Sequence, residues 1–257
     1  MMTSDTTQPV YALVTGGVNG IGRAIVQALL TRVGKNGGAI FIFDCVRAED
    51  SLVTALEKLG VIYIQVDLRS VDEIADGVKK LQAILEANYA GANLSLLVNN
   101  AGITRDALAL RVKELDWNAV LEVNLKAAFF CIQKVLPLLM KNGKGYIINM
   151  SSVVALKANP GQVSYAASKA GLIAMTRTIA AEYASRSIYC NAIAPGCIKT
   201  RMTEELPLQV QESILSHVPL KRFGLPEEIA DLVLFLSSGK ADYITGQTIT
   251  IDGGLSL

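Results

Sequence analysis

The stretch Thr15-Gly16-Gly17-Val18-Asn19-Gly20-Ile21-Gly22 lies directly after a short apolar run and before an amphipathic helical pattern. Glycines at such a turn let a pyrophosphate approach the backbone, where the amides and dipole of the helix N-terminus stabilise its charge. Glycine-rich turns also occur at ordinary tight bends, but this one opens a strand-helix-strand unit. The stretch therefore predicts a dinucleotide-binding site, with the spacing GxxxGxG in place of GxGxxG.

The rest of the chain continues the alternation of short apolar runs and longer stretches of helical periodicity. The predicted strands are residues 11–15, 39–43, 61–66, 94–98, 146–150, 188–193 and 247–251. The predicted helices are residues 21–32, 48–59, 71–87, 116–141, 162–186 and 226–237. This alternation predicts an α/β fold, a Rossmann-like, doubly wound, seven-stranded parallel sheet with helices on both faces.

Composition points to one domain that spans residues 1–257, because no linker, repeat or low-complexity segment divides the chain. Lys and Arg number 24 against 23 Asp and Glu, so no long-range field favours nucleic acid or an anionic membrane. Apolar runs are too short for a membrane span, as where Pro137 interrupts one. The first ten residues show no secretory or transit pattern, and we expect a cytoplasmic protein.

The four cysteines give no metal or disulfide signature, since Cys45, Cys131, Cys190 and Cys197 form no CxxC motif. The only histidine, His217, falls in a predicted loop, which argues against a Ser-His-Asp triad. No lowered thiol pKa is indicated for Cys197, which we interpret as a small packing residue. The general acid or base must therefore be sought among other residue types.

Tyr165 and Lys169 are spaced i, i+4 near the start of a predicted helix and so share one face. An ammonium about 5 Å from a phenol stabilises the phenolate by roughly 3 kcal/mol, or about two pKa units. Tyr165 is then a candidate general acid. Ser152 precedes it in the same segment and can hydrogen-bond a carbonyl oxygen as charge develops there. The pattern alone leaves the adjacent Ser151 open for the same role.

Asp44 ends the second predicted strand, at the position where dinucleotide folds hold the ribose hydroxyls with an acidic side chain. A carboxylate there repels a 2′-phosphate, which favours NAD(H). Arg47 lies three residues further on and could turn toward a phosphate. NADP(H) therefore remains the alternative cofactor.

Taken together, these motifs resemble the classical short-chain dehydrogenases/reductases, whose glycine turn reads TGxxxGIG. The resemblance covers nearly the whole chain and rests, in order, on residues 15–22, Asn99-Asn100-Ala101-Gly102, Asn124, Ser152, Tyr165 with Lys169, and Pro195-Gly196. It implies a catalytic tetrad of Asn124, Ser152, Tyr165 and Lys169, in which the asparagine holds a water that joins the lysine to a proton relay.

The resemblance also implies a set of cofactor contacts. Asp67 and Leu68 would meet the adenine, and Asn19 is uncharged where NADP-preferring members often carry a basic residue. The full implied set is Gly16, Asn19, Gly20, Ile21, Gly22, Asp44, Asp67, Leu68, Asn100, Gly102, Tyr165, Lys169, Pro195, Ile198 and Thr200.

Within the family, the stretches that begin at Asn99, Ser151 and Ala194 are similar to the 3-oxoacyl-[acyl-carrier-protein] reductases. The implied reaction is hydride transfer between a nicotinamide cofactor and a 3-oxoacyl thioester, with acyl carrier protein as a possible partner. Basic side chains near the cleft mouth would dock that acidic partner, or else are solvated helix-end cations. The candidates are Lys141, Lys144, Lys157 and Arg186.

Asp44, Asn19 and the long connection at residues 87–93 depart from that subfamily. They permit a second hypothesis, an NAD-dependent dehydrogenase of another secondary alcohol such as a 3-hydroxyacyl-CoA, a steroid or a polyol. A third hypothesis is a catalytically silent, cofactor-binding scaffold, against which the intact tetrad argues.

The stretch from residue 195 to about residue 225 shows no clear pattern and predicts a substrate lid at about residues 197–220. The resemblance implies a homotetramer. Its contacts would be made by the helices at residues 116–141 and 162–186 and by the C-terminal strand with Asp252-Gly253-Gly254.

Overall fold

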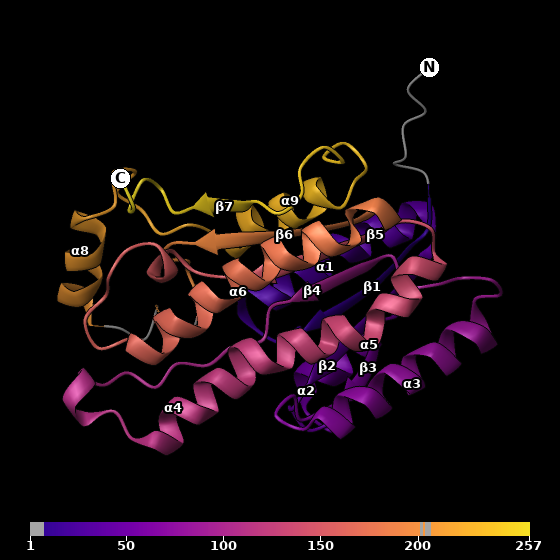
Figure 1. Cartoon of the computed structure of the whole chain (residues 1–257), viewed down its shortest axis with the longest axis horizontal. Helices are drawn as coiled ribbons and strands as arrows, with labels where there is room; N and C mark the ends of the chain where they lie inside the picture. The colour runs from indigo at the N-terminus through magenta and orange to yellow at the C-terminus, as the bar shows by residue number, and fades with distance from the viewer. Residues whose placement is uncertain (1–7, 201–202, 204–206) are drawn as a thin grey trace.

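All seven strands of the computed structural model are parallel and form one sheet in the order β3-β2-β1-β4-β5-β6-β7 (Figure 1). The structure describes residues 8–200, 203 and 207–257. The chain adds strands outward from β1 to β3 and then returns to the other side of β1 as β4. The strands are β1 (Val10–Thr15), β2 (Gly38–Asp44), β3 (Ile62–Gln65), β4 (Leu96–Asn99), β5 (Gly145–Met150), β6 (Ile188–Pro195) and β7 (Thr248–Ile251).

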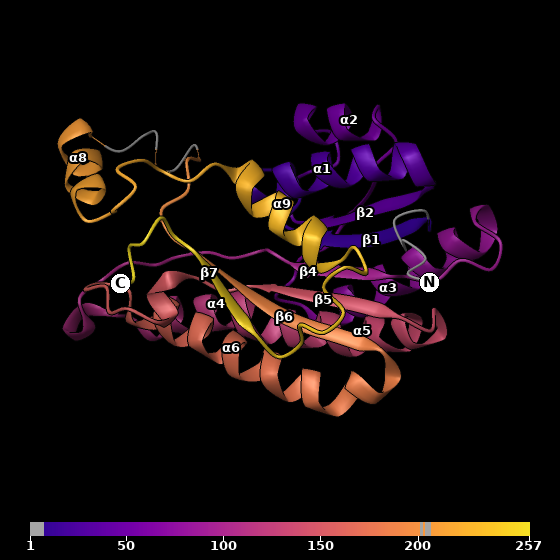
Figure 2. The same cartoon turned by 90° about the horizontal axis from the view of Figure 1, so that it is seen from above.

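Helices cover both faces of the sheet, as Figure 2 shows. One face carries α1 (Gly20–Asn36), α2 (Ser51–Glu57) and α9 (Pro226–Leu236), and the other carries α3 (Val71–Asn88), α4 (Glu114–Leu121), α5 (Ala127–Lys141) and α6 (Val163–Tyr183). Successive residues of β1 enter opposite cores, since Ala12 and Val14 join the α1 side and Leu13 the α3 side. The predicted doubly wound α/β fold is confirmed.

The helix starts follow from local side chains. Ser70 accepts a hydrogen bond from the Glu73 amide at 3.2 Å, and two acidic residues occupy the first turn of α3. Asp50 caps α2 in the same way, through the Leu52 amide at 2.8 Å. Each cap satisfies a backbone donor that has no partner within its helix.

Residues Glu114–Lys141 are long and apolar enough to span a membrane by length and composition. The helix continues through Pro137, the residue that interrupts the apolar run in the sequence. The proline is exposed. Half of the most apolar window of this run is nevertheless buried inside the protein, where Ile132, Val135 and Leu139 have no exposed surface. The run therefore serves as a core helix that packs on the sheet.

The stretch before α9 contains a helix that was not predicted from the sequence, α8 (Leu208–Ser216). None of its residues is buried. Leu208, Ile214 and Leu215 lie at helical spacing but are exposed or half-buried, so the helical signal was present in the sequence and was overlooked. In Figure 1, α8 lies beyond the end toward which the strand arrow of β6 points.

Candidate active site

The glycine turn joins the carboxyl end of β1 to α1, beside the point where the strand order reverses. Gly16 and Gly20 have φ values of 65° and 54°, which glycine adopts without strain. A Cβ on Gly22 would lie 2.1 Å from the carbonyl oxygen of Gly16. Parallel α/β sheets bind their ligands at such a reversal.

This turn is tied to the end of β4 through Thr15 and Asn100. The Thr15 hydroxyl accepts hydrogen bonds from the amides of Asn100 and Ala101 at 3.0 and 3.1 Å. The Asn100 side chain donates to the carbonyls of Thr15 and Gly16 at 3.1 and 2.9 Å. The start of the turn and the end of β4 are therefore held together, each by a side chain from the other.

The residues of the turn fit a pyrophosphate. Asn19 stands at the N-cap of α1, but its side chain makes no capping hydrogen bond, and the first turn carries no acidic residue. The N-terminal amides of this 17-residue helix are thus left without a side-chain partner from the cap. Uncapped amides next to exposed glycine are the donors that an anionic phosphate requires.

Asp44 lies at the end of β2, against the glycine turn. Its carboxylate accepts hydrogen bonds from the amides of Val18 and Val46 at 3.3 and 3.4 Å. Arg47 is exposed, and its guanidinium makes no hydrogen bond or ion pair with any part of the chain that the structure describes. The carboxylate is therefore held at this edge, whereas the guanidinium is not.

Asp67 and Leu68 follow β3, the strand next to β2. The Asp67 carboxylate pairs with Arg69 at 2.6 Å, and this hydrogen bond lowers the pKa of Asp67 below its usual value. Leu68 is buried. Motif reading missed Arg69, because an arginine two residues after an aspartate has no distinctive spacing.

Ser152, Tyr165 and Lys169 come together at the carboxyl end of β5. The Lys169 ammonium is buried, donates to the Met150 carbonyl at 2.7 Å and lies 5.6 Å from the centroid of the Tyr165 ring. Ser152 hydrogen-bonds the Tyr165 hydroxyl and lowers its pKa. The three side chains that the sequence predicted to be catalytic therefore lie close together.

Ser151 is separated from this cluster by its own hydrogen bond. Its hydroxyl donates to the Lys169 carbonyl at 2.9 Å, and the side chain is buried. The geometry therefore favours Ser152 over Ser151, a choice that the sequence pattern left open.

Burial dominates the protonation of both catalytic candidates. It raises the pKa of Tyr165 above its usual value of 10, a larger effect than the lowering by Ser152. It also lowers the pKa of Lys169 to about 8. The net shift of the Tyr165 pKa is therefore upward, whereas the lowering expected from the Lys169 charge alone has the opposite sign. Tyr165 remains a protonated donor at neutral pH.

Asn124 occupies a π-helical turn, Glu122–Lys126, between α4 and α5. Its Oδ1 accepts from the Ile103 amide at 2.8 Å, and its Nδ2 donates to the Ile103 carbonyl and the Ser168 hydroxyl, both at 3.0 Å. A Cβ on Gly102 would lie 3.3 Å from both Asn124 Oδ1 and Lys169 Nζ. Asn124 and Lys169 therefore converge beside Gly102, and π turns of this kind frequently occur at functional sites.

The segment after β6 extends from Pro195 toward the glycine turn. Ile198 is buried, and the methyl group of Thr200 lies 3.8 Å from the position of a Cβ on Gly20. The backbone of Gly224 pairs with both neighbours of Ile198: its amide donates to the Cys197 carbonyl at 3.0 Å and its carbonyl accepts from the Lys199 amide at 2.8 Å. These two hydrogen bonds hold the start of the segment against the residue two positions before α9. Residues 201–202 and 204–206 of the predicted lid lie outside the described residues.

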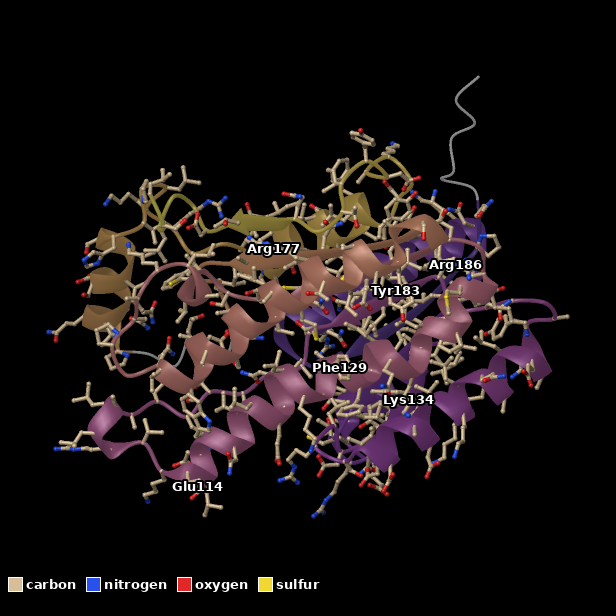
Figure 3. The ribbon with its side chains drawn as sticks, viewed as in Figure 1. Glu114, Phe129, Lys134, Arg177, Tyr183 and Arg186 are labelled. Carbon is tan, nitrogen blue, oxygen red and sulfur yellow. The ribbon has the colours of Figure 1, made fainter. Side chains whose placement is uncertain are left out.

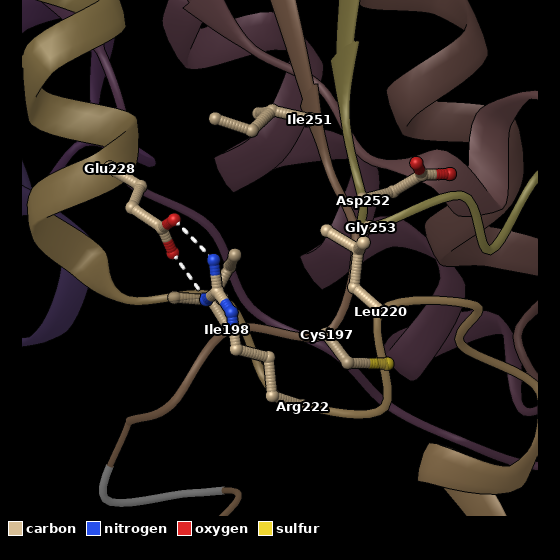
Figure 4. Close-up of a pocket in the computed structure, with 9 residues that line it drawn as sticks. Cys197, Ile198, Leu220, Arg222, Glu228, Ile251, Asp252 and Gly253 are labelled. Atoms are coloured by element: carbon tan, nitrogen blue, oxygen red, sulfur yellow. Dashed lines mark hydrogen bonds and ion pairs between the residues drawn. The ribbon is translucent and has the colours of Figure 1, made fainter.

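A small cavity lies beneath this segment, between Cys197, Leu220 and Asp252 (Figure 4). Arg222 and Glu228 form a two-pronged ion pair at its rim, with N···O distances of 2.6 and 2.8 Å. Burial and the nearby Asp252 raise the pKa of the Cys197 thiol. A protonated thiol in this setting agrees with a packing role.

Three of the four predicted docking cations are not at the cleft mouth of this chain. Lys141, Lys144 and Arg186 lie at the amino end of the sheet, where α5 and α6 end and β5 and β6 begin, and Figure 3 shows Arg186 at the end of the molecule opposite α8. Lys144 pairs with Asp242 at 2.6 Å. Helices that run antiparallel to the strands return their C-termini to the amino edge, so this prediction was wrong for these three residues.

Lys157 is the fourth candidate and lies on the correct side of the sheet, in the segment between Ser152 and α6. Its ammonium donates to the Leu255 carbonyl at 2.6 Å. This cation therefore has an intramolecular partner at the C-terminus.

Comparison with known proteins agrees with this geometry. The family described as enoyl-(acyl carrier protein) reductase matches residues 16–256. A 3-oxoacyl-[acyl-carrier-protein] reductase FabG of Thermotoga maritima is 47% identical over 244 residues, which covers 95% of this chain and 96% of the relative. FabG of Staphylococcus aureus is 44% identical over 246 residues, covering 95% and 97%. A 3-oxoacyl-[acyl-carrier-protein] reductase of Synechocystis sp. is 42% identical over 257 residues, covering 99% of each.

Proposed function

The chain belongs to the short-chain dehydrogenase/reductase family of nicotinamide-dependent oxidoreductases, and we propose that it reduces 3-oxoacyl thioesters carried by acyl carrier protein, with NADH as the preferred reductant. One observation carries the proposal: Ser152 and Tyr165, both half-buried, form a single cluster with the buried Lys169, in a chain that matches 3-oxoacyl reductases along nearly its whole length.

The proposed cofactor site uses residues from the ends of five strands, β1, β2, β3, β4 and β6. The amides at the start of α1 hold the pyrophosphate, and Asp44 accepts hydrogen bonds from the ribose hydroxyls. The bound dinucleotide supplies the hydride. The remaining contacts come from Asp67 and Leu68 at the adenine, Asn100 and Gly102 along the cleft, Tyr165 and Lys169, and Pro195, Ile198 and Thr200 at the nicotinamide end.

The chemistry assigned to the chain is proton donation and charge stabilisation at the 3-oxo group. Ser152 donates a hydrogen bond to the carbonyl oxygen, which becomes negative as the carbon is reduced. Tyr165 donates its phenolic proton to that same oxygen. Its raised pKa keeps the phenol protonated before the reaction begins.

Lys169 and Asn124 support this proton transfer. The positive charge of Lys169, close to the Tyr165 ring, stabilises the phenolate left after the proton has moved. Asn124 Oδ1 and Lys169 Nζ converge beside Gly102, and we assign to them the water that returns a proton to the tyrosine.

The preference for NADH rests on Asp44. A 2′-phosphate would meet its carboxylate, while within the described residues no contact fixes the Arg47 guanidinium near that position. We expect Asp44→Ala to raise kcat/KM with NADPH relative to NADH. An unchanged ratio would remove Asp44 from cofactor choice.

Initial rates with acetoacetyl-CoA, crotonyl-CoA and a panel of secondary alcohols test the reaction itself. Acetoacetyl-CoA contains a 3-oxo group, whereas crotonyl-CoA contains the carbon-carbon double bond that an enoyl reductase would use. We expect reduction of acetoacetyl-CoA alone. Rates on 3-hydroxyacyl-CoA, steroid or polyol substrates with NAD⁺, without acetoacetyl-CoA turnover, would favour the second hypothesis.

We also propose a cytoplasmic homotetramer built from single-domain subunits with a lid at about residues 197–220. Figure 3 shows Phe129 and Lys134 on α5 beside Arg177 and Tyr183 on α6, and Phe129 is 39% exposed. An exposed phenylalanine on a helix of the core is suited to contact with a second copy. Light scattering should give about four times the chain mass of 27.4 kDa.

A further inference from the structure

Tyr63 lies on β3, one strand away from the residues that would bind the ribose. In the sheet it pairs in register with Ile42 of β2, two residues before Asp44. Its hydroxyl lies within hydrogen-bond distance of two carbonyls, that of Asp44 at 2.9 Å and that of Val46, and shares its one proton between them. One phenol therefore spans both sides of the turn at which β2 ends.

The same turn is connected to the cofactor edge by the Asp44 side chain. One carboxylate oxygen accepts from the Val46 amide within the turn, and the other accepts from the Val18 amide in the glycine turn. The Asp44 carbonyl also accepts from the Val66 amide at 2.9 Å. Tyr63, residues 44–46 and Val18 thus form one continuous set of hydrogen bonds.

Within this set of hydrogen bonds, the Val46 carbonyl depends most on Tyr63. The Asp44 carbonyl keeps the Val66 amide if the phenol is removed, but among the described residues only Tyr63 donates a hydrogen bond to the Val46 carbonyl. Without it, Val46 is free to turn, and its amide no longer fixes the Asp44 carboxylate. Burial and the nearby carboxylate raise the pKa of Tyr63, so the phenol remains a donor at neutral pH.

We propose that Tyr63 is a positioning residue for cofactor selection, which holds the turn at residues 44–46 so that the Asp44 carboxylate faces the ribose. This inference rests on the proposed role of Asp44. The residue touches neither substrate nor reacting atoms, and it acts through Asp44 alone. Its removal should therefore change which dinucleotide binds and leave the chemical step intact.

The test is Tyr63→Phe, which keeps the ring that packs on the core and removes only the hydroxyl. Tyr146→Phe is the matched control, because Tyr146 is also a strand tyrosine whose hydroxyl donates a hydrogen bond, to Asp242 at 2.8 Å, and it lies on β5, on the other side of β1 from β3. Dissociation constants of NADH and NADPH are measured by fluorescence without substrate. Hydrogen exchange of residues 44–47 is measured without cofactor.

For Tyr63→Phe we expect the dissociation constant of NADH to rise about fivefold, the value for one lost hydrogen bond, while that of NADPH changes little. Exchange at residues 44–47 should accelerate, and kcat at saturating NADH should stay unchanged. Tyr146→Phe should show none of these effects.

Two results would overturn the inference. If Asp44→Ala shifts the NADH to NADPH ratio and Tyr63→Phe does not, Asp44 selects the cofactor without help from Tyr63. If Asp44→Ala itself leaves the ratio unchanged, the proposed cofactor preference fails, and the role of Tyr63 fails with it.

Discussion

The two ends of the cleft are held by different kinds of contact. At the cofactor end, four hydrogen bonds join Thr15 and Gly16 at the start of the glycine turn to Asn100 and Ala101 at the end of β4. At the substrate end, the segment before α9 is tied by the backbone of Gly224, and α8 has no buried residue. The difference indicates that the cofactor end is preformed, whereas the substrate end can open at low free-energy cost.

The largest effect is expected from Gly22→Ala, which adds a side-chain atom to the preformed cofactor end of the cleft. The added Cβ would lie 2.1 Å from the Gly16 carbonyl, and that backbone is fixed by Asn100. We expect loss of measurable NADH binding in titrations, with a free energy of unfolding lower by about 2 kcal/mol or more.

Gly34→Ala is its matched control, because Gly34 lies in the same helix and has no atom within 4 Å of an added Cβ. Alanine there should stabilise the protein by up to about 1 kcal/mol and leave NADH binding unchanged. Equal loss of binding in both variants would contradict the claim of a preformed turn.

A pair of variants, Ser152→Ala and Ser151→Ala, distinguishes a catalytic serine from a structural one. Both residues lie where the cofactor end and the substrate end of the cleft meet. Ser152→Ala should lower kcat about 100-fold or more with little change in melting temperature, since it removes a donor to the developing oxyanion. Ser151→Ala should cost about 1 kcal/mol of stability through its lost bond to the Lys169 carbonyl, with kcat nearly unchanged. The reverse pattern would reassign the catalytic serine.

The pH dependence of reduction reports on Lys169. Burial lowers the pKa of its ammonium to about 8, and lysine is charged below its pKa. Because the charge stabilises the Tyr165 phenolate, kcat should be constant below that pKa and fall as the pH rises through it. A rate that stays level well above this pH would show that the charge of Lys169 is not required.

The smallest effect is expected at the substrate end, from Glu228→Gln. The Arg222 guanidinium holds the pKa of Glu228 at about 2, below its usual 4.5, so the pair stabilises the protein above pH 4.5 and is lost as the pH falls toward 2. Its exposed setting limits the effect to about 1 kcal/mol or less.

Melting temperatures of both proteins across this range check the prediction. The difference in melting temperature between wild type and Glu228→Gln should decrease as the pH falls. A difference that is independent of pH would show that the ion pair does not stabilise this region.

The sequence predicted the features that rest on strong local patterns. All seven strands formed close to the expected residues, because buried parallel strands are nearly continuous apolar runs. The spacing of Tyr165 and Lys169 on one helix likewise placed both side chains in the same cluster.

What the sequence could not predict depends on contacts between distant segments. Tyr63 reads as one more apolar strand residue until its hydroxyl is placed against the Asp44 and Val46 carbonyls. Arg186 reads as a docking cation until the direction of α6 places it at the far end of the sheet. Neither property can be predicted from one segment alone, because each depends on how distant segments are arranged.

The most direct test of the account is single-turnover reduction of acetoacetyl-CoA by wild type and Tyr165→Phe, with NADH affinity measured on the same samples. The phenol is assigned as the proton donor, so the variant should bind NADH within about twofold of wild type and reduce the thioester about 1,000-fold more slowly. Turnover within about tenfold of wild type would contradict the assignment of Tyr165 as general acid.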